Sequence, residues 1–176
     1  YDIIGFTSTF HQNLASLALA KQIKALHPDV TILFGGANWE GEMGAALLEV
    51  FDFVDASCSG EGDVAFPLCV RAIGAGKPLH TIPGIQVGPG AKAAAASVDI
   101  DVNVELSVGS TYIENLDDLA VPDFEPYFKA MADSAFGLEV GSILLLETAR
   151  GCWWGDHSHC TFCGLNGSAM RFRSKS

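Results

Sequence analysis

Three closely spaced cysteines are the strongest chemical signal in the sequence. Cys152, Cys160 and Cys163 follow the spacing C-x7-C-x2-C, directly after an apolar run that ends near Thr148. Three thiolates from one loop can hold three irons of a [4Fe–4S] cluster and leave the fourth iron without a protein ligand. An open iron is what a catalytic cluster needs, so we predict that these three residues ligate such a cluster.

A structural zinc site is the alternative use of the same cysteines. Together with His157 or His159, the three thiolates would supply the four ligands of a tetrahedral zinc ion. Glycines around the cysteines favour the cluster, because they let the backbone wrap closely around it. Phe162, just before the last cysteine, would shield a cluster and offer it a flat surface.

Small and polar residues that follow three apolar runs form a second candidate site. The runs cover residues 2–7, 30–34 and 53–58 and read as buried strands. In a parallel sheet, ligands bind at the loops after the carboxyl ends of the strands. The candidate ligand-binding residues in these loops are Ser8, Thr9, Gly35, Gly36, Gly60, Glu61 and Gly62. A hydroxyl can bond a buried ligand there, and glycines leave room for it.

Helical patterns alternate with these strands and must position the loops. Apolar residues recur at helical spacing over 13–27, 42–51 and 64–73. Strands and helices in alternation, with nearly continuous apolar strands, indicate an α/β fold whose parallel sheet carries helices on both faces. We therefore predict a Rossmann-like domain over residues 1–77.

The helix expected over 64–73 illustrates the local reasoning. Asp63 is a plausible N-cap, because its carboxylate can accept a hydrogen bond from the first turn. Phe66, Val70 and Ile73 recur at helical spacing and are expected to face inward. The nearby carboxylates of Glu61 and Asp63 have an alternative role as helix-start charges without any ligand.

The rest of the chain has a different pattern. Residues 78–141 read as an irregular connector with short pieces such as 84–87 and 102–105. We expect a small hairpin within this connector and a short helix that begins within 122–128. Ser142 to Thr148 reads as a further buried strand. The expected organisation is a first domain over 1–77, a connector over 78–141 and an incomplete further domain over 142–176.

Composition and charge exclude several classes of protein. Of 176 residues, 49% are hydrophobic and 18% charged, which argues against disorder. The net charge of −11 disfavours nucleic acids and anionic membranes as partners. No apolar run is long enough to span a bilayer. The odd number of cysteines suits reduced thiolates in a cytoplasm-like compartment. Because Tyr1 begins within an apparent strand, we expect the sequence to be a fragment.

The last thirty residues resemble a known family. The motifs are Leu146-Glu-Thr-Ala-Arg-Gly-Cys152, then Cys160-Thr-Phe-Cys163-Gly-Leu-Asn-Gly, then Met170-Arg-Phe-Arg-Ser-Lys-Ser. They resemble radical SAM enzymes that mature ribosomally made peptides. The commonest radical SAM spacing is C-x3-C-x2-C, and the longer first gap is typical of this peptide-maturation branch. The resemblance implies the start of a (β/α) barrel, a cluster on the three cysteines and S-adenosylmethionine beside Phe162.

The strand-end loops resemble a second family, the cobalamin-binding domains. Ser8-Thr9-Phe10 is similar to the Ser-x-Leu motif, and Gly35-Gly36 follows 24 residues later. Gly60-Glu61-Gly62-Asp63 resembles the Gly-Glu-Gly-Glu segment of cobalamin-type radical SAM proteins. The resemblance implies that the seven loop residues contact cobalamin and that the first domain is a truncated cobalamin-binding domain.

The two resemblances together imply a function. They point to a cobalamin-dependent radical SAM enzyme that modifies a precursor peptide, plausibly by C-methylation through a 5′-deoxyadenosyl radical and methylcobalamin. An external electron donor and the peptide are the implied partners, and the parent protein, rather than this chain alone, is expected to show turnover. The alternative is a non-catalytic Rossmann-like binding module with a structural zinc site.

Overall fold

The computed structural model describes residues 1–89, 111–135, 137, 143–163 and 171–176. The chain divides into two compact units, Tyr1–Ile113 and Glu114–Ser176. The first unit contains a four-stranded sheet with its helices, and the second contains the cysteine loop. Each unit is considered by itself below.

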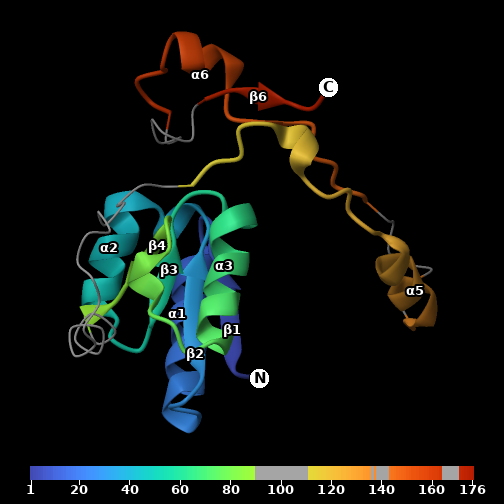
Figure 1. Ribbon diagram of the computed structural model, residues 1–176. Coiled ribbons are helices and arrows are strands. Elements are labelled where there is room, and N and C mark those ends of the chain that lie inside the picture. Colours follow the sequence, from blue (N-terminus) through green and yellow to red (C-terminus); the bar gives the residue numbers. More distant parts are fainter. Residues whose placement is uncertain (90–110, 136, 138–142, 164–170) are drawn as a thin grey trace. The chain divides into compact units, whose positions relative to one another are not determined.

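The first unit alternates strands and helices, as the sequence predicts (Figure 1). Its elements are β1 (Ile3–Thr7), α1 (Gln12–Leu26), β2 (Thr31–Gly35), η1 (Ala37–Trp39), α2 (Gly41–Val50), β3 (Ala56–Cys58), α3 (Gly62–Gly74), η2 (Leu79–Thr81) and β4 (Ile85–Val87). The strand order is β1-β2-β3-β4, with the first three strands parallel. The predicted α/β fold is confirmed in this form.

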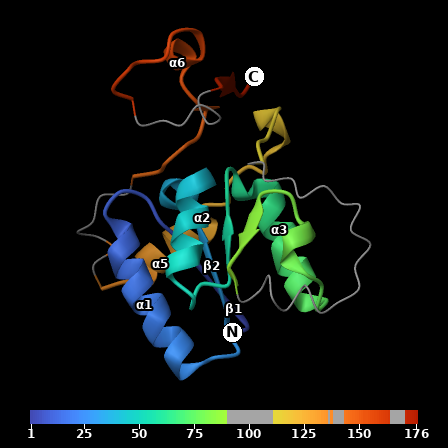
Figure 2. The same cartoon turned by 90° about the vertical axis from the view of Figure 1, so that its left-hand side faces the viewer.

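Helices cover both faces of the sheet (Figure 2). Ile32 and Phe34 of β2 lie in one core with residues of α1 and α2. Leu33, between them, lies in a second core with Cys69 of α3. Because side chains alternate between the two faces of a strand, a strand covered on both faces must be apolar at every position. This requirement explains the continuous apolar run of β2.

A partly buried ion pair lies at the amino-terminal end of the sheet. Lys24 of α1 donates to the carboxylate of Asp55, just before β3, with the Nζ–Oδ2 distance at 2.8 Å. The same carboxylate oxygen accepts from the backbone N–H of Ile32 at 2.7 Å. Asp55 therefore ties one helix and two strands together.

Helix α3 begins earlier than the sequence predicts. Its first residue is Gly62, and Glu61 occupies the N-cap position in an extended conformation. The prediction of Asp63 as N-cap is wrong, since Asp63 lies within the first turn. The buried positions are Ala65 and Cys69. Phe66 and Val70, which were expected inside, are 43% and 37% exposed. An earlier start of α3 does not change which side chains share a face of the helix. The face that packs on the sheet carries the smaller residues.

Residues 84–87 also differ from the prediction. They belong to the sheet and not to an irregular connector, because β4 pairs antiparallel with β3, with Val87 opposite Ala56. Val87 is buried in the core that contains Leu33. A short apolar run gains more from an existing sheet, which satisfies its backbone groups, than from an isolated hairpin. Residues 102–105, the other short piece of the predicted connector, lie outside the described part of the chain.

The second unit contains short elements. They are η3 (Leu116–Asp118), α5 (Glu125–Asp133), β5 (Ala149–Arg150), α6 (Trp153–His157) and β6 (Arg173–Ser174). The helix expected to begin within 122–128 is confirmed as α5. Strands β5 and β6 pair antiparallel, with Arg150 opposite Arg173. No helix in the described ranges is long and apolar enough to cross a membrane.

The buried strand predicted from Ser142 to Thr148 is not observed. Ser142 lies outside the described residues, and 143–148 have no regular secondary structure. Ile143 and Leu145 are 79% and 84% exposed. Within the described residues, regular strand pairing begins only at Ala149, so the apolar run has no ladder that could bury it. An apolar run becomes a strand only when a neighbouring strand satisfies its backbone groups.

Candidate functional site

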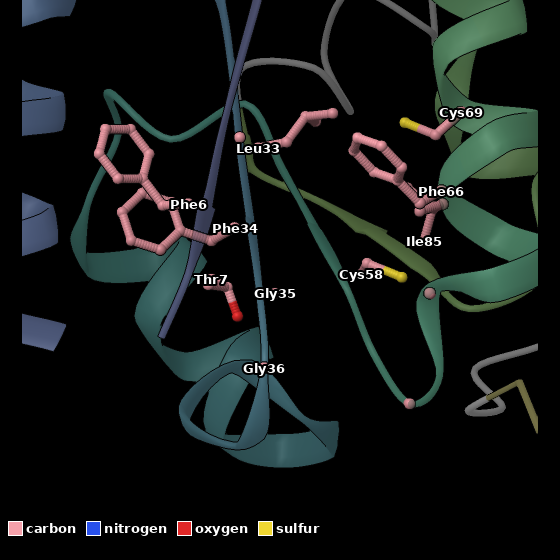
Figure 3. A pocket seen from close by; sticks show the side chains of 13 residues that line it. Phe6, Thr7, Leu33, Phe34, Gly35, Gly36, Cys58, Phe66, Cys69 and Ile85 are labelled. Carbon is pink, nitrogen blue, oxygen red and sulfur yellow. The ribbon is translucent and has the colours of Figure 1, made fainter. Parts of the chain in front are cut away.

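A pocket of about 460 Å³ lies between α3 and the carboxyl-terminal halves of β1, β2 and β3 (Figure 3). It is lined by Gly5, Phe6, Thr7, Leu33, Phe34, Gly35, Gly36, Cys58, Gly60, Gly62, Phe66, Cys69 and Ile85. No lining residue carries a charge at neutral pH. A pocket of this size and apolar character suits a planar or aliphatic group of a small molecule.

Missing side chains create this pocket. A Cβ on Gly5 would lie 3.9 Å from the Phe66 ring, and one on Gly35 would lie 3.8 Å from the Cβ of Cys58. Larger side chains at these two positions would therefore extend into the space between the sheet and α3. The pocket therefore depends on glycine at these two positions. At the neighbouring position in the sheet, Leu33 fills the corresponding space with an apolar side chain.

Four of the seven loop residues predicted to bind a ligand line this pocket. They are Gly35, Gly36, Gly60 and Gly62, contributed by the ends of β2 and β3 and the start of α3. These four residues lie together at one edge of the sheet, as predicted, because the carboxyl ends of parallel strands meet there. That these glycines contact a cofactor stays a prediction.

Gly36 has a further structural role. Its φ of +88° lies in the region that favours glycine. A Cβ there would stand 2.6 Å from the backbone oxygen of Ser8. The residue lets the turn after β2 pass close to the end of β1, where the Ser8 N–H donates to the Gly35 oxygen at 2.8 Å.

Ser8 and Thr9 do not line the pocket. Ser8 is fully buried, and its hydroxyl donates to Asn13 at 3.2 Å and accepts from Asn38 at 3.0 Å. The Trp39 indole N–H donates to the same Asn13 oxygen at 2.9 Å. The Thr9 hydroxyl donates to the Gln12 side chain at 3.0 Å. Both hydroxyls, in the loop between β1 and α1, thus have intramolecular partners in α1 or η1.

Glu61 binds another part of the first unit. One carboxylate oxygen accepts from the backbone N–H of Ile113 at 2.7 Å. The Glu61 backbone N–H donates to the oxygen of Thr111 at 2.8 Å, and the Thr111 hydroxyl donates to the Glu61 oxygen at 2.8 Å. We call Thr111–Ile113 the strap. These contacts give Glu61 a structural task whether or not a ligand is present.

Several residues of the pocket were not predicted from the sequence. Cys58 and Cys69 face it from β3 and α3, and Phe66 forms part of its wall (Figure 3). Burial, with a smaller effect of Asp63, raises the pKa of Cys58, and burial raises the pKa of Cys69 to about 11. Both thiols are therefore protonated at neutral pH and behave as small apolar groups. Gly5 within β1 and Gly35 at the end of β2 would have been a usable signal, because glycine in a strand leaves space on the face of the sheet.

The three cysteines of the second unit lie in one loop whose ends are joined by β5 and β6. Cys152 is the N-cap of α6, and its sulfur accepts from the Gly155 N–H at 3.3 Å. The Cys163 N–H donates to the Cys160 oxygen at 3.0 Å, which turns the chain between these two ligand candidates. Phe162, within this turn, is 91% exposed.

The loop suits a metal centre in its ligand type but is not arranged as one. All three cysteines are free and half-buried. In the described ranges, no three His, Cys, Asp or Glu side chains converge into a group that could hold a metal ion. Three thiols within one turn-rich loop fit the donor set of an iron–sulfur cluster. Binding would have to draw the sulfurs together, as is common where metal binding and folding are coupled.

His157 faces its own helix. Its Nδ1 donates to the Trp153 carbonyl oxygen at 2.8 Å, and its ring lies 5.1 Å from the Trp153 ring. One ring nitrogen is therefore engaged inside α6. This contact leaves only Nε2 for the zinc site that the sequence offers as an alternative.

The chain is similar to a protein of the archaeon Pyrococcus horikoshii that is named only as an uncharacterized methyltransferase. The two are 26% identical over 173 residues, which cover 97% of this chain and 32% of the relative. This chain thus spans about a third of the relative's length, and the alignment includes both units. No protein-family model matches the chain.

Proposed function

We propose that the chain is part of an enzyme that transfers a methyl group. The observation that carries the proposal is the alignment of 97% of the chain with a methyltransferase, since it covers the pocket and the cysteine loop together. A Rossmann-like sheet with a pocket at its carboxyl edge is consistent with this activity. The chain is about a third as long as the relative, so the reaction as a whole is proposed for the complete protein.

At a finer level, we propose a cobalamin-dependent radical SAM methyltransferase. Cys152, Cys160 and Cys163 would hold a [4Fe–4S] cluster, with Phe162 beside S-adenosylmethionine. The pocket would hold the nucleotide tail of cobalamin, because its glycines leave space and its walls are apolar. When bound, these groups would supply one-electron chemistry and a carrier for the methyl group.

The chain's own residues would then have separate tasks. The glycines of the pocket leave room for the ligand, and the protonated thiols of Cys58 and Cys69 keep its wall uncharged. The N–H of Gly155 would stabilise negative charge on the Cys152 sulfur. The proposed substrate is a ribosomally made precursor peptide, and reduction would come from an external donor in a reducing compartment.

Anaerobic reconstitution with iron and sulfide tests the cysteine loop. We expect a brown chain with nearly four irons and sulfides per chain, and the Cys160→Ala/Cys163→Ala variant is expected to bind none. The matched control is Cys58→Ala/Cys69→Ala, which removes two thiols from the pocket. A colourless chain that instead binds one zinc ion through the three cysteines would contradict the cluster and favour the binding-module alternative.

Retention of hydroxocobalamin on gel filtration tests the pocket. We expect the wild-type chain to retain it at micromolar concentration and Gly5→Leu to lose it, because the new side chain would fill the space opposite Phe66. Thr9→Ala is the matched control, since Thr9 does not line the pocket. Equal retention by Gly5→Leu and wild type would contradict this location for cobalamin.

A further inference from the structure

The strap lies against the loop that borders the pocket, and two carboxylates hold it. Besides the Glu61–Ile113 contact, the hydroxyl of Tyr112 donates to the carboxylate of Glu40 at 3.0 Å. Glu40 precedes α2 and Glu61 precedes α3, so the strap bridges the loops after β2 and β3. Gly60 and Thr111 form a β-bridge, which extends the contact along the backbone.

Glycine at position 84 leaves room for the strap. Gly84 has a φ of +79°, and a Cβ there would come within 2.9 Å of both side-chain branches of Thr111. The Gly84 oxygen also accepts from the Ser59 N–H at 2.7 Å. The strap therefore packs against Gly84 close to the end of β3, and this close approach requires the absence of a side chain at Gly84.

Glu61 differs from Glu40 in its relation to the pocket. Its two neighbours in the chain, Gly60 and Gly62, both line the pocket, whereas Glu40 does not. A group that enters the pocket therefore touches the backbone on both sides of Glu61. Any shift of that backbone moves the carboxylate that holds the Ile113 N–H.

We infer that Glu61 is a positioning residue that couples occupation of the pocket to attachment of the strap. A strap that is held restricts the loop at Gly60–Gly62, and a filled pocket restricts the same loop and so strengthens the hold on the strap. Because coupling between two sites is reciprocal, weakening the strap contact must also weaken binding in the pocket. The inference takes from the proposed function only the identity of the ligand, cobalamin.

The strap also marks where the first unit ends. Ile113 is its last residue, and the next residue, Glu114, belongs to the unit that carries the cysteines. Attachment of the strap would then depend on the pocket at the point where the chain continues into the cysteine unit. In this role, Glu61 of the Gly-Glu-Gly segment acts without direct contact with a ligand.

Two measurements on the ligand-free chain test the coupling. Hydrogen exchange at the Ile113 amide reports release of the strap, and alkylation of Cys58, quantified by mass spectrometry, reports opening of the pocket loop. We expect Glu61→Gln and Glu61→Asp to raise both rates about fivefold, at the low end of typical couplings. Glu61→Asp keeps the charge but shortens the side chain, so its agreement with Glu61→Gln excludes a purely electrostatic effect on the thiol.

Glu42→Gln is the matched control, because Glu42 is an exposed carboxylate in the first turn of α2 and forms no ion pair or hydrogen bond with the strap in the described part of the chain. It is expected to leave both rates unchanged. Faster exchange at Ile113 in both Glu61 variants, with Cys58 alkylated at the wild-type rate, would overturn the inference and leave Glu61 as a local tie. An unchanged rate at Ile113 would overturn it as well.

Hydroxocobalamin then tests the same coupling from the other side. We expect it to slow exchange at Ile113 in the wild type and to bind about fivefold more weakly to both Glu61 variants. Wild-type protection with unchanged affinity in the variants would contradict reciprocity and overturn the inference. If the wild-type chain retains no cobalamin, the cobalamin part of the proposed function fails, and the ligand-free rates still decide whether Glu61 couples the pocket to the strap.

Discussion

At the scale of single residues, backbone constraints and ligand signals coincide in the same motifs. Gly36 lines the pocket, yet its φ and its closeness to Ser8 already require glycine. Ser8 is buried in a hydrogen-bond network, and Glu61 holds the strap. Each of these residues was predicted to bind a ligand, and each has a structural task in the ligand-free chain. A motif residue can therefore be essential without touching a ligand.

Gly36→Ala is expected to cost more stability than Gly41→Ala. Both residues have positive φ, but a Cβ on Gly41 meets nothing within 4 Å. We expect Gly41→Ala to lower the free energy of unfolding by about 1 kcal/mol, and Gly36→Ala to lower it by about 3 kcal/mol, because overpacking adds to the strain. Urea denaturation measures both, and equal losses would contradict the close approach to Ser8.

The pKa of Cys69 predicts how stability depends on alkaline pH. Burial raises this pKa from 9.0 to about 11, so between these values the unfolded chain loses the thiol proton and the folded chain keeps it. The free energy of unfolding must therefore fall as pH rises from 9 to 11, by about 2 kcal/mol in total. Urea denaturation across this range measures the slope, and Cys69→Ala is expected to remove this part of it. An identical slope in the variant would contradict the shift.

At the scale of elements, pairing with the sheet determines whether a short apolar run forms a strand. Residues 85–87 pair with β3 and form a strand, whereas the longer run over 143–148 has no regular structure. Both runs have strand-like composition, so composition does not separate them. The difference is a neighbouring strand, because backbone hydrogen bonds between strands come from outside the segment. Helices satisfy their own backbone groups, which is why α1, α2, α3 and α5 were found from sequence.

Asp55→Ala tests the tie between α1, β2 and β3. The substitution leaves the Lys24 ammonium and the Ile32 N–H without this acceptor. Side chains of the pair are 22% and 31% exposed, so water replaces part of the loss. We expect the free energy of unfolding to fall by about 2 kcal/mol. Asp52→Ala, at an exposed site nearby, should change it by less than about 0.5 kcal/mol in the same urea titration.

At the scale of the whole molecule, the hydrophobic cores belong to the first unit. Both clusters of buried residues fall between Ile3 and Val87. In the second unit, Leu116 and Arg173 are the residues classed as buried among those described, and many apolar side chains are exposed. The free energy that stabilises the described fold therefore comes mainly from residues before the strap.

Residues 1–113, produced alone, test this division. We expect this segment to unfold cooperatively in urea with a midpoint close to that of the full chain, because both cores are retained. Residues 114–176 alone should show no cooperative transition. Circular dichroism during urea titration measures both. A first segment that loses its cooperative transition would contradict the assignment of the cores.

The sequence by itself determined the alternation of strands and helices, the edge of the sheet where four predicted glycines meet, and the cysteine spacing. Periodicity and strand-end chemistry are local properties, so they can be read along the chain. Only the tertiary structure decided that Ser8 is internal, that Glu61 holds the strap, and that Cys58 and Cys69 face one pocket. These facts depend on which distant segments pack together, and many residues at once set that packing.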